Sequence, residues 1–530
     1  MKLRICLLTV LVLSAPGVET IDTEVCIYGA TAAGVMAAVQ VVREGKPVVL
    51  LEPGTFAGGI SVDGLGGTDI DNHSFKNSVA VGGLAAEFYR RIGKTYGKNG
   101  FGLRFEPHVA QSVIDGLLAE HGVKPRLRER LMLGADGVEK SGSRLTAIRL
   151  ESGLTVRAKV FIDATIEGDL LHAAGVSTVI GREANALYGE TKNGIRGMNT
   201  YRQFEVKVDP FRIPGDPNSG LIPTVSDEPF GTPGDGDHRL QGFCFRFCFT
   251  KVEANRVPFT KPDGYDPAQY EIYLRYLKSG GKLFSPAANL PNVKTDLGSW
   301  HDLSLNLYGM NYEYPGGDYA TRERVVRFHR VFSQGLCYFL ANDPAVPEAT
   351  RKVWSQWGTC KDEFQDNDGW PRLFYVRDAR RMVSDYVITE HHTRKTNQTP
   401  VEDPIAIAYW PPDTHHVRRI VKDGFCYNEG FVFGGDDWAP FGISYRSLVP
   451  KVSECTNLLA GSCPSSTHVA YGAIRLEWTF MAIGQACGSA AVIAARDNLT
   501  VQQVPYTALR ERLLADKQVV VLAGDHPSKK

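Results

Sequence analysis

One segment near the start of the chain constrains its fold more than any other. A short apolar run precedes Gly29 and Gly34, an Ala- and Val-rich stretch follows, and a second apolar run ends in Glu52. This order predicts a strand, a glycine turn, a helix and a second strand. Gly29 allows a sharp turn, and the amides that open the helix near Thr31 would face a pyrophosphate. With Glu52 placed for ribose hydroxyls, the pattern predicts a dinucleotide-binding βαβ unit.

The glycine loop is only moderately specific on its own. Thr31 stands where the usual fingerprint has its middle glycine, so the loop has the form G-x-x-x-x-G. An ordinary buried βαβ crossover that binds no nucleotide has the same pattern. Both interpretations stay open on this motif alone.

Length and charge limit the class of protein. A chain of 530 residues, 43% of them hydrophobic, is long enough for two or more packed units. Lys and Arg together number 59, as do Asp and Glu, so no net charge favours nucleic acid or an anionic membrane. A charged substrate would therefore have to meet a local cluster of side chains.

The first 17 residues have the pattern of a secretory signal peptide. A basic start at 1–4 precedes an apolar run at 5–13 and small residues at 14–17. The run is too short to span a membrane, and no other segment approaches that length. We expect a secreted or periplasmic protein; a buried N-terminal strand is the alternative.

Two later segments have features of a nucleotide site. A strand beginning at Thr155 ends in a small-residue turn at 163–169, which could pass beneath a nucleotide. Near the C-terminus, a short strand ends at Gly461, and residues 471–475 open a helix rich in small residues. A helix N-terminus there could stabilise the negative charge of a reduced flavin ring. Each segment alone is also compatible with plain α/β packing.

Eight runs along the chain then match a known family. With them the chain resembles an exported group of FAD-dependent oxidoreductases within the two-dinucleotide-binding, glutathione-reductase-like flavoprotein superfamily. The runs are GGIS (58–61), GLGGTD (64–69), FEPHVA (105–110), DATIEGDL (163–170), GREAN (181–185), VRDARRM (376–382), ISYRS (443–447) and STHVAYGAIR (466–475).

The resemblance implies an α/β fold, a Rossmann-like FAD-binding domain of the glutathione-reductase type with an inserted α+β substrate domain. It implies FAD as the cofactor but does not identify a substrate. The residues that it places at the cofactor are Gly29, Ala33, Gly34, Glu52, Gly58, Gly59, Asp163, Ala164, Thr165, Gly168, Asp169, Gly461, Gly472, Ile474 and Arg475.

The expected domains are discontinuous. The boundaries are a signal peptide at 1–17, an FAD-binding domain at 22–190 and 440–500, a substrate or cap domain at 191–439, and a C-terminal helix and tail at 501–530. Within the substrate domain, the pattern predicts strands over 199–250 and helices over 319–342 and 363–392. The alternating aromatic run at 243–249 predicts a strand whose aromatic face packs in the core.

Two histidines are candidates for acid–base chemistry. His468 lies in a segment expected to run past the flavin ring, where it could accept the proton of a substrate hydroxyl. His415 follows Asp413 and several aromatic residues, a combination that suits a hydroxyl-rich ligand. The alternatives are a structural role for His468 and a solvated loop around His415.

Arg377 is the third catalytic candidate. Arg377, Arg380 and Arg381 have a helical spacing that would gather them on one side. Such a cluster could hold a carboxylate or stabilise flavin charge, while ion pairing with Asp378, Asp385 or Glu390 is the alternative. Weaker candidates are Arg446, Tyr445, His108 and, for covalent flavin attachment, His73. The histidine pairs at 391–392 and 415–416 lack metal-site spacing, so no metal is expected.

These features together predict an exported flavoprotein oxidoreductase. FAD would accept hydride from an alcohol-type or carbohydrate-like small molecule and pass electrons to a second, unidentified acceptor. No nucleic-acid partner is expected. The alternative is a non-redox protein on the same fold, either a polysaccharide lyase or a flavin-stabilised binding protein, in which His415 and the arginines would act on a uronate.

Overall fold

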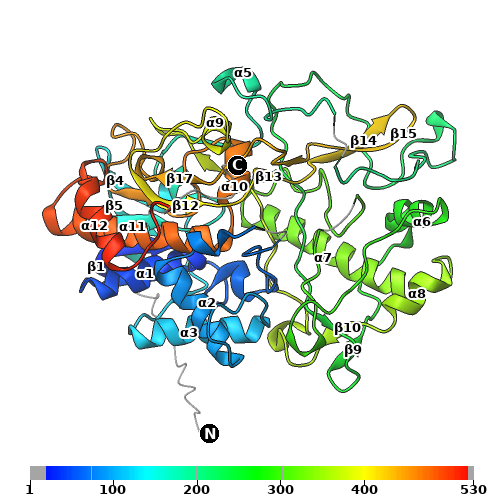
Figure 1. Cartoon of the computed structure of the whole chain (residues 1–530), viewed down its shortest axis with the longest axis horizontal. Helices are drawn as coiled ribbons and strands as arrows, with labels where there is room; N and C mark the ends of the chain where they lie inside the picture. The colour runs from blue at the N-terminus through cyan, green and yellow to red at the C-terminus, as the bar shows by residue number, and fades with distance from the viewer. Residues whose placement is uncertain (1–18, 73–74, 199–200, 300–301, 523–530) are drawn as a thin grey trace, which may run out of the picture.

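The computed structural model describes residues 19–72, 75–198, 201–299 and 302–522. The predicted signal peptide and His73 lie outside these residues. The two ends of the chain, blue and orange-red in Figure 1, lie together on one side of the molecule, and the green middle of the chain forms the other side. Segments far apart in sequence therefore build one region, as a discontinuous fold requires.

A seven-stranded, mostly parallel sheet organises the first region. The central strands run parallel to one another, and two antiparallel strands extend the sheet at one edge. In spatial order the strands are β3 (Arg126–Leu127), β2 (Val48–Glu52), β1 (Thr20–Tyr28), β6 (Thr155–Asp163), β5 (Arg144–Arg149) and β4 (Val138–Ser141), with β18 (Leu458–Ala460) beside one end of β6.

The sequence of β1 explains why this strand is central. Val25 and Ile27 pack into one core, whereas Cys26 and Tyr28 pack into another on the opposite face of the sheet. Alternate side chains of a strand point to opposite faces, so a strand that is apolar throughout must be covered on both sides. The predicted strand–turn–helix–strand unit is present: α1 (Ala32–Arg43) connects β1 to β2. This confirms a Rossmann-like arrangement.

Helix α11 (Glu477–Asp497) joins the C-terminal segment to this unit. It packs closely on α1 because two positions carry no side chain. A Cβ on Gly484 would lie 2.0 Å from Ala33 O, and one on Gly488 would lie 2.7 Å from Ala37 O. These two glycines allow the helices to approach at backbone distance.

The start of this helix differs from the expected one. The sequence predicted one helix opening at 471–475, but α10 (His468–Ile474) ends there, and α11 starts after the extended residue Leu476. Gly472 lies inside α10, where a Cβ would come within 3.0 Å of the Asp413 backbone. Close packing against that loop, rather than helix initiation, explains this glycine.

Helix α11 meets the length and composition of a membrane span, which corrects the expectation that no segment beyond the N-terminus would do so. Its most apolar stretch has a mean hydropathy of 1.4 and is fully buried inside the protein. The buried core helix of a protein can have the same length and composition. Among the described residues, α11 is the one helix with this length and hydropathy.

The middle of the chain forms its own core. Its apolar residues, from Val208 to Cys426, cluster with one another rather than with the large sheet. The helices of this region are α6 (Glu271–Lys278), α7 (Tyr319–Asn342) and α8 (Glu348–Trp354), beside a three-stranded sheet of β8 (Phe249–Thr250), β10 (Gly358–Cys360) and β9 (Arg256–Pro258).

The aromatic run at 243–249 packs in this second core as expected. Phe245, Phe247 and Phe249 stack in sequence, with ring centroids 6.2 Å and 5.1 Å apart. The backbone is only partly a strand, because most of the segment forms isolated bridges to separate partners.

One predicted helix is present and one is wrong. The helix expected at 319–342 is α7, capped by Asp318, whose side chain accepts from Thr321 N. The helix expected at 363–392 is absent from that stretch apart from short turns near its ends. The chain there is extended instead: Tyr375 bridges Cys244, and β11 (Arg381–Met382) pairs with β7 (Thr178–Val179). Pairing with distant segments overrides the local periodicity.

The remaining elements complete both regions. They are α2 (Gly83–Thr95), α3 (Pro107–Glu120), α4 (Asp169–Ala173), α5 (Asn185–Tyr188), α9 (Glu390–Thr393), α12 (Tyr506–Ala515), β12 (Pro404–Ala408), β13 (Asp413–Thr414), β14 (Arg418–Lys422), β15 (Phe425–Glu429), β16 (Val432–Phe433) and β17 (Phe441–Ser444). Ile405 and Ala406 of β12 join the core of the large sheet, although the expected substrate domain included them. The domain boundaries stay a prediction.

Candidate functional site

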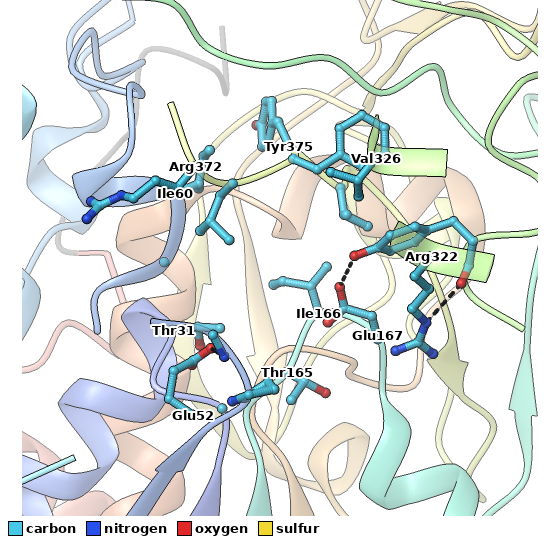
Figure 2. Close-up of a pocket in the computed structure, with 18 of the residues that line it drawn as sticks. Thr31, Glu52, Ile60, Thr165, Ile166, Glu167, Arg322, Val326, Arg372 and Tyr375 are labelled. Atoms are coloured by element: carbon cyan, nitrogen blue, oxygen red, sulfur yellow. Dashed lines mark hydrogen bonds between the residues drawn. The ribbon is translucent and has the colours of Figure 1, made fainter. Parts of the chain in front are cut away.

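A cavity of about 480 Å³ lies between the ends of β1, β2 and β6 and the helix α7. Figure 2 shows Thr31, Glu52 and Thr165 on one side of it, with Tyr375 and Val326 across from them. Ligands of open α/β sheets bind outside the carboxyl ends of the strands, which is where this cavity lies.

The helix α1 presents its N-terminus to this cavity. Thr31 caps the helix: its Oγ1 accepts from Gly34 N at 3.4 Å and donates to Ala164 O at 2.7 Å. The first intrahelical bond runs from Val35 N to Thr31 O, so the amides of Ala32 and Ala33 precede it. Both residues line the cavity. Free amides at the positive end of a helix dipole form a site for a phosphate group.

Gly29 makes the turn before this helix. Its φ is +100°, in the region that favours glycine, and a Cβ there would lie 2.7 Å from Thr165 N and 2.8 Å from the carbonyl carbon of Ala164. No side chain fits between these two backbones. The glycine therefore allows the β1 turn and the β6 turn to meet at the floor of the cavity.

Glu52 closes the loop at the end of β2. Its two carboxyl oxygens accept from Ala30 N and Gly54 N, each at 2.7 Å. Burial raises the pKa of this carboxyl to about 7, against the opposing effect of the two amides. Glu52 lines the cavity and is a charged acceptor available to hydroxyl groups.

Asp163 has a structural role behind the cavity wall. Its Oδ1 accepts from both the amide and the hydroxyl of Thr165, and its Oδ2 accepts from Leu171 N. Burial raises the pKa of Asp163 to about 6. These bonds hold the turn after β6, so that Thr165 rather than Asp163 lines the cavity.

The expected cofactor residues divide into two groups. Those that line the cavity are Gly29, Ala33, Glu52, Gly59, Thr165, Asp169 and Arg475. Those that lie behind the lining are Gly34, Gly58, Asp163, Ala164, Gly168, Gly461, Gly472 and Ile474. The second group packs the turns and helices that present the first.

Two arginines flank Tyr375 at the far side of the cavity. The Arg377 guanidinium carbon lies 4.7 Å from the centroid of the Tyr375 ring, and Arg475 Nη1 donates to the Tyr375 hydroxyl at 3.3 Å. All three residues line the cavity. Arg377 lies on extended chain, so the predicted helical cluster of three arginines is wrong. Arg380 and Arg381 instead pair with carboxylates in other segments, Asp169 and Glu183 respectively.

Glu477 also lines this side of the cavity, and the sequence analysis did not single it out. Its Oε2 accepts from Ser61 Oγ at 2.8 Å. Burial raises the pKa of Glu477 to about 7. An acid at the start of an otherwise apolar, small-residue helix is the signal that would have found it.

The three expected catalytic residues belong to one buried set of side chains. We call this set the polar network; its members are His468, Asp378, Gln241, His415, Asn306 and Arg377. At one end, His468 Nδ1 lies 3.1 Å from Asp378 Oδ2, and Asp378 Oδ1 accepts from Gln241 N at 3.2 Å. The network thus joins residues from five widely separated segments.

The other end of the polar network reaches the cavity. His415 N donates to Gln241 Oε1 at 2.9 Å, and its ring Nδ1 lies 3.5 Å from Asn306 Nδ2. Asn306 Oδ1 accepts from Arg377 Nη1 at 3.0 Å. Burial, with the nearby Arg377 charge, holds the pKa of His415 well below its usual range, so this imidazole is neutral. Arg377 lines the cavity, whereas His415 and His468 do not; their catalytic roles stay predictions.

Further polar pairs fix the wall that α7 contributes. Arg322 forms a bidentate pair with Asp169 at 2.6 Å and 2.7 Å, and Tyr314 donates to Glu167 Oε1 at 2.9 Å. Burial raises the pKa of Glu167. Sequence reasoning identified only Asp169 in this group, because the partners come from distant parts of the chain.

The weaker candidates lie elsewhere. Tyr445 donates to Val501 O, and Arg446 pairs with Asp403. His108 Nδ1 lies 2.7 Å from Glu363 Oε1. His108, Glu363 and Glu106 form a group whose spacing would suit a metal ion. The Lys294 ammonium lies 2.7 Å from Glu106 and 2.7 Å from Glu363, so a cation is already present there.

The cavity fits the FAD that the sequence resemblance implies. The α1 amides suit the pyrophosphate, and Glu52 suits the ribose. At Gly59, a Cβ would come within 3.3 Å of Thr31 Cα, so its absence leaves room beside the helix start. The volume also lies within the range of cofactor pockets, roughly 300–1,000 Å³.

Comparison with known proteins agrees with this interpretation at the level of the family. A sequence profile described as FAD dependent oxidoreductase matches residues 24–513. Among curated proteins, no sequence matches the chain significantly.

Solved structures match only in part. An L-amino acid deaminase from Proteus vulgaris is 17% identical (33% of this chain, 55% of that chain, TM-score 0.21). Thioredoxin reductase from T. acidophilum is 24% identical (27% of this chain, 34% of that chain, TM-score 0.18). The flavin-dependent brominase Bmp2 is 18% identical (31% of this chain, 42% of that chain, TM-score 0.23). The match spans less than two thirds of each of these proteins and carries no argument about activity. The profile, by contrast, covers nearly the whole sequence, and the chain therefore belongs to the FAD dependent oxidoreductase family.

Proposed function

We propose that the protein is a flavoenzyme that oxidises an alcohol-type or carbohydrate-like small molecule and passes the electrons to a second acceptor. One observation carries this proposal. A single cavity has one side, at α1 and Glu52, that suits phosphate and ribose groups, and another side with a buried carboxyl and two arginines, at Glu477, Arg377 and Arg475. The first side suits a dinucleotide, and the second suits a reacting substrate.

Bound FAD supplies the hydride acceptor for such an oxidation. The protein must then remove the hydroxyl proton. Glu52 and Glu477 both line the cavity with a pKa of about 7, and Glu477 is the one beside Arg475 and Tyr375. Ser61 Oγ donates to Glu477 Oε2 at 2.8 Å and orients the carboxyl, which leaves Glu477 Oε1 to accept a proton. We assign Glu477 as the general base, and His468 as a positioning residue through Asp378.

Aromatic and apolar side chains make up part of the lining on this side. Phe374, Tyr375, Ile60 and Phe480 border the cavity beside Glu477 and Arg475. A low-dielectric wall strengthens interactions between these charged groups and a polar substrate. A hydroxyl-bearing substrate would be bound here by few but strong polar contacts.

The test is an anaerobic absorption experiment on the purified, FAD-loaded protein. A panel of sugars, sugar acids and small alcohols is added one at a time. The expected result is bleaching of the oxidised flavin band with one class of compound. A flavin that stays oxidised while a sugar acid is converted to an unsaturated product would replace the proposal by the lyase alternative.

The cellular location belongs to the same proposal. The N-terminal pattern at 1–17 supports export, to the periplasm or the medium. N-terminal sequencing of protein recovered from those fractions is expected to begin soon after residue 17. Recovery of the protein with an intact N-terminus inside the cell would contradict export.

A further inference from the structure

Arg377 carries a buried charge without a protein counter-charge. Its side chain is 1% exposed. Its guanidinium donates to Gly242 O, to Asn306 Oδ1 and to Cys244 Sγ, all of them neutral acceptors. Among the described residues, no carboxylate lies within the 4.0 Å ion-pair distance of this guanidinium. A buried charge that is unpaired is costly, so its persistence needs a reason.

Three other deeply buried arginines are paired. Arg381 contacts Glu183 at 2.7 Å, Arg418 contacts Glu429 at 2.9 Å, and Arg322 contacts Asp169 at 2.6 Å. Arg419 is, among the described residues, a second buried arginine with neutral partners, but it lies over the rings of Phe204 and Tyr308 and does not line the cavity. Arg377 differs from Arg419 because the cavity gives it access to a ligand.

Two buried donors on residues that line the cavity have no partner. These are Arg377 Nε and Arg475 Nε. Native proteins leave few such atoms unsatisfied, so two of them beside one cavity indicate a missing ligand. Both atoms are donors, so the ligand must bring acceptors.

The local charge favours an anion. Arg377 and Arg475 flank Tyr375, and the nearest carboxylate oxygen to Arg475 that forms a pair belongs to Asp413, at 3.9 Å. Glu477 is the buried acid on this side, and burial raises its pKa. Two arginines therefore exceed the negative charge that the wall supplies.

We infer that the substrate carries a carboxylate group and that Arg377 binds it. This inference rests on the proposed function, since it names the substrate class for the same cavity. A carboxylate matches the planar donor fork of a guanidinium and would neutralise the unpaired charge. The substrate is then a hydroxy acid or a sugar acid rather than a neutral alcohol or sugar.

The phosphates of the cofactor are not the ligand of Arg377. The phosphate-binding amides of Ala32 and Ala33 lie at the α1 start, and Figure 2 shows Thr31 across the cavity from Tyr375, over which Arg377 lies. Phosphates held at α1 therefore lie across the cavity from the Tyr375 side. The test below includes the alternative that Arg377 contacts the flavin instead.

The experiment compares matched ligands on the FAD-loaded full chain. The pairs are glycolate with ethylene glycol, lactate with propane-1,2-diol, and glucuronate with glucose. Binding is measured by calorimetry and by the ligand-induced rise in melting temperature, neither of which requires flavin reduction. We expect at least one carboxylate to bind with a Kd below about 10 mM and at least about tenfold more tightly than its neutral partner.

Three variants locate the effect. Arg377→Met removes the charge at similar volume and is expected to weaken carboxylate binding about 10- to 100-fold. Arg377→Lys keeps the charge but loses the fork, so an intermediate loss is expected. Arg419→Met is the matched control, a buried arginine with neutral partners away from the cavity, and should bind the carboxylate like the wild type.

The outcomes separate this inference from the proposed function. Equal binding of neutral partners, no carboxylate binding at all, or unchanged carboxylate binding by Arg377→Met would overturn the inference. Loss of FAD without loss of carboxylate binding would assign Arg377 to the cofactor and overturn it too. Carboxylate binding that depends on Arg377 but never bleaches the flavin would leave the inference standing and contradict the oxidation. If Arg377→Met fails to fold, the wild-type comparison still tests the carboxylate, and Arg377→Lys tests the role of the residue.

Discussion

The two sides of the cavity are built in different ways. The nucleotide side, at Gly29, Thr31 and Glu52, comes from one continuous stretch in which a turn, a helix start and a strand end follow one another. The substrate side, with the polar network and Glu477, is assembled from distant segments, such as those of Gln241 and His415, which are 174 residues apart. Backbone amides dominate the first side, and charged side chains dominate the second.

This difference predicts which substitutions each side tolerates. A site made of backbone groups depends on the path of the chain, so it loses binding when an added side chain displaces the backbone. A site made of buried side chains depends on their chemistry, so it fails when a charge or a proton acceptor is removed. The four predictions below use this contrast, starting with the largest effect.

Gly29→Ala should do the most damage. The new Cβ would lie 2.7 Å from Thr165 N, in a backbone conformation with φ +100°, which together cost about 4 kcal/mol of folding free energy. We expect little soluble protein, or protein without flavin, by chemical denaturation and flavin absorbance. The control is Gly45→Ala, also at positive φ (+75°) but with no atom within 4 Å, for which about 1 kcal/mol is expected. Equal effects of the two variants would contradict the close packing at Gly29.

Glu477→Gln should slow flavin reduction by about 100-fold or more, because it removes the proton acceptor at nearly constant volume. Reduction is measured by anaerobic stopped-flow absorbance. In the wild type the base must be ionised, so the rate should rise with pH and reach half its maximum near the pKa of about 7. That pH dependence should vanish in the variant. Glu313→Gln, at a side chain that is 70% exposed, is the control and should behave like the wild type.

Glu52→Ala should weaken FAD binding by about 10- to 100-fold, since a charged acceptor for hydroxyl groups is lost. FAD titration followed by fluorescence measures the change, and circular dichroism checks the fold. In the wild type, ribose hydroxyls would stabilise the ionised carboxyl, whose pKa is about 7 without ligand. FAD affinity should therefore increase as pH rises from about 6 to about 8. Unchanged affinity in the variant would remove Glu52 from the cofactor site.

His468→Asn should have the smallest effect, a decrease in kcat of no more than about tenfold with little change in FAD content. His468 contacts Asp378 behind the cavity wall, so its loss shifts the polar network without removing a group that touches substrate. Steady-state kinetics gives kcat and KM separately. A loss as large as that of Glu477→Gln would make His468 the proton acceptor and remove the distinction drawn between the two.

The sequence predicted the nucleotide side because its determinants are local. Gly29, the helix start and Glu52 lie within one short stretch, and their order alone indicates the turn, the dipole and the acceptor. The family resemblance then located the turn at Thr165. Asp163 and Gly472 were also predicted at the cofactor, but they pack behind the cavity wall instead of lining it. Spacing along the chain does not distinguish these two roles.

The substrate side was only partly predictable. His468, His415 and Arg377 were chosen one by one, but nothing in the sequence showed that Asp378, Gln241 and Asn306 connect them. The helix expected around Arg377 was wrong because that segment pairs with distant strands, and tertiary pairing overrides helical spacing. Glu477 was missed because one acid in an apolar helix has no partner nearby in sequence.

The packing of α11 on α1 has a consequence for synthesis. The large sheet receives β18, and α1 receives its covering helix, only from residues 458–497. On the ribosome, the N-terminal βαβ unit must therefore wait, with one face uncovered, while the whole middle region emerges and forms its own core. The first part of the cavity wall to be translated is thus covered late, only after residues 458–497 have been made.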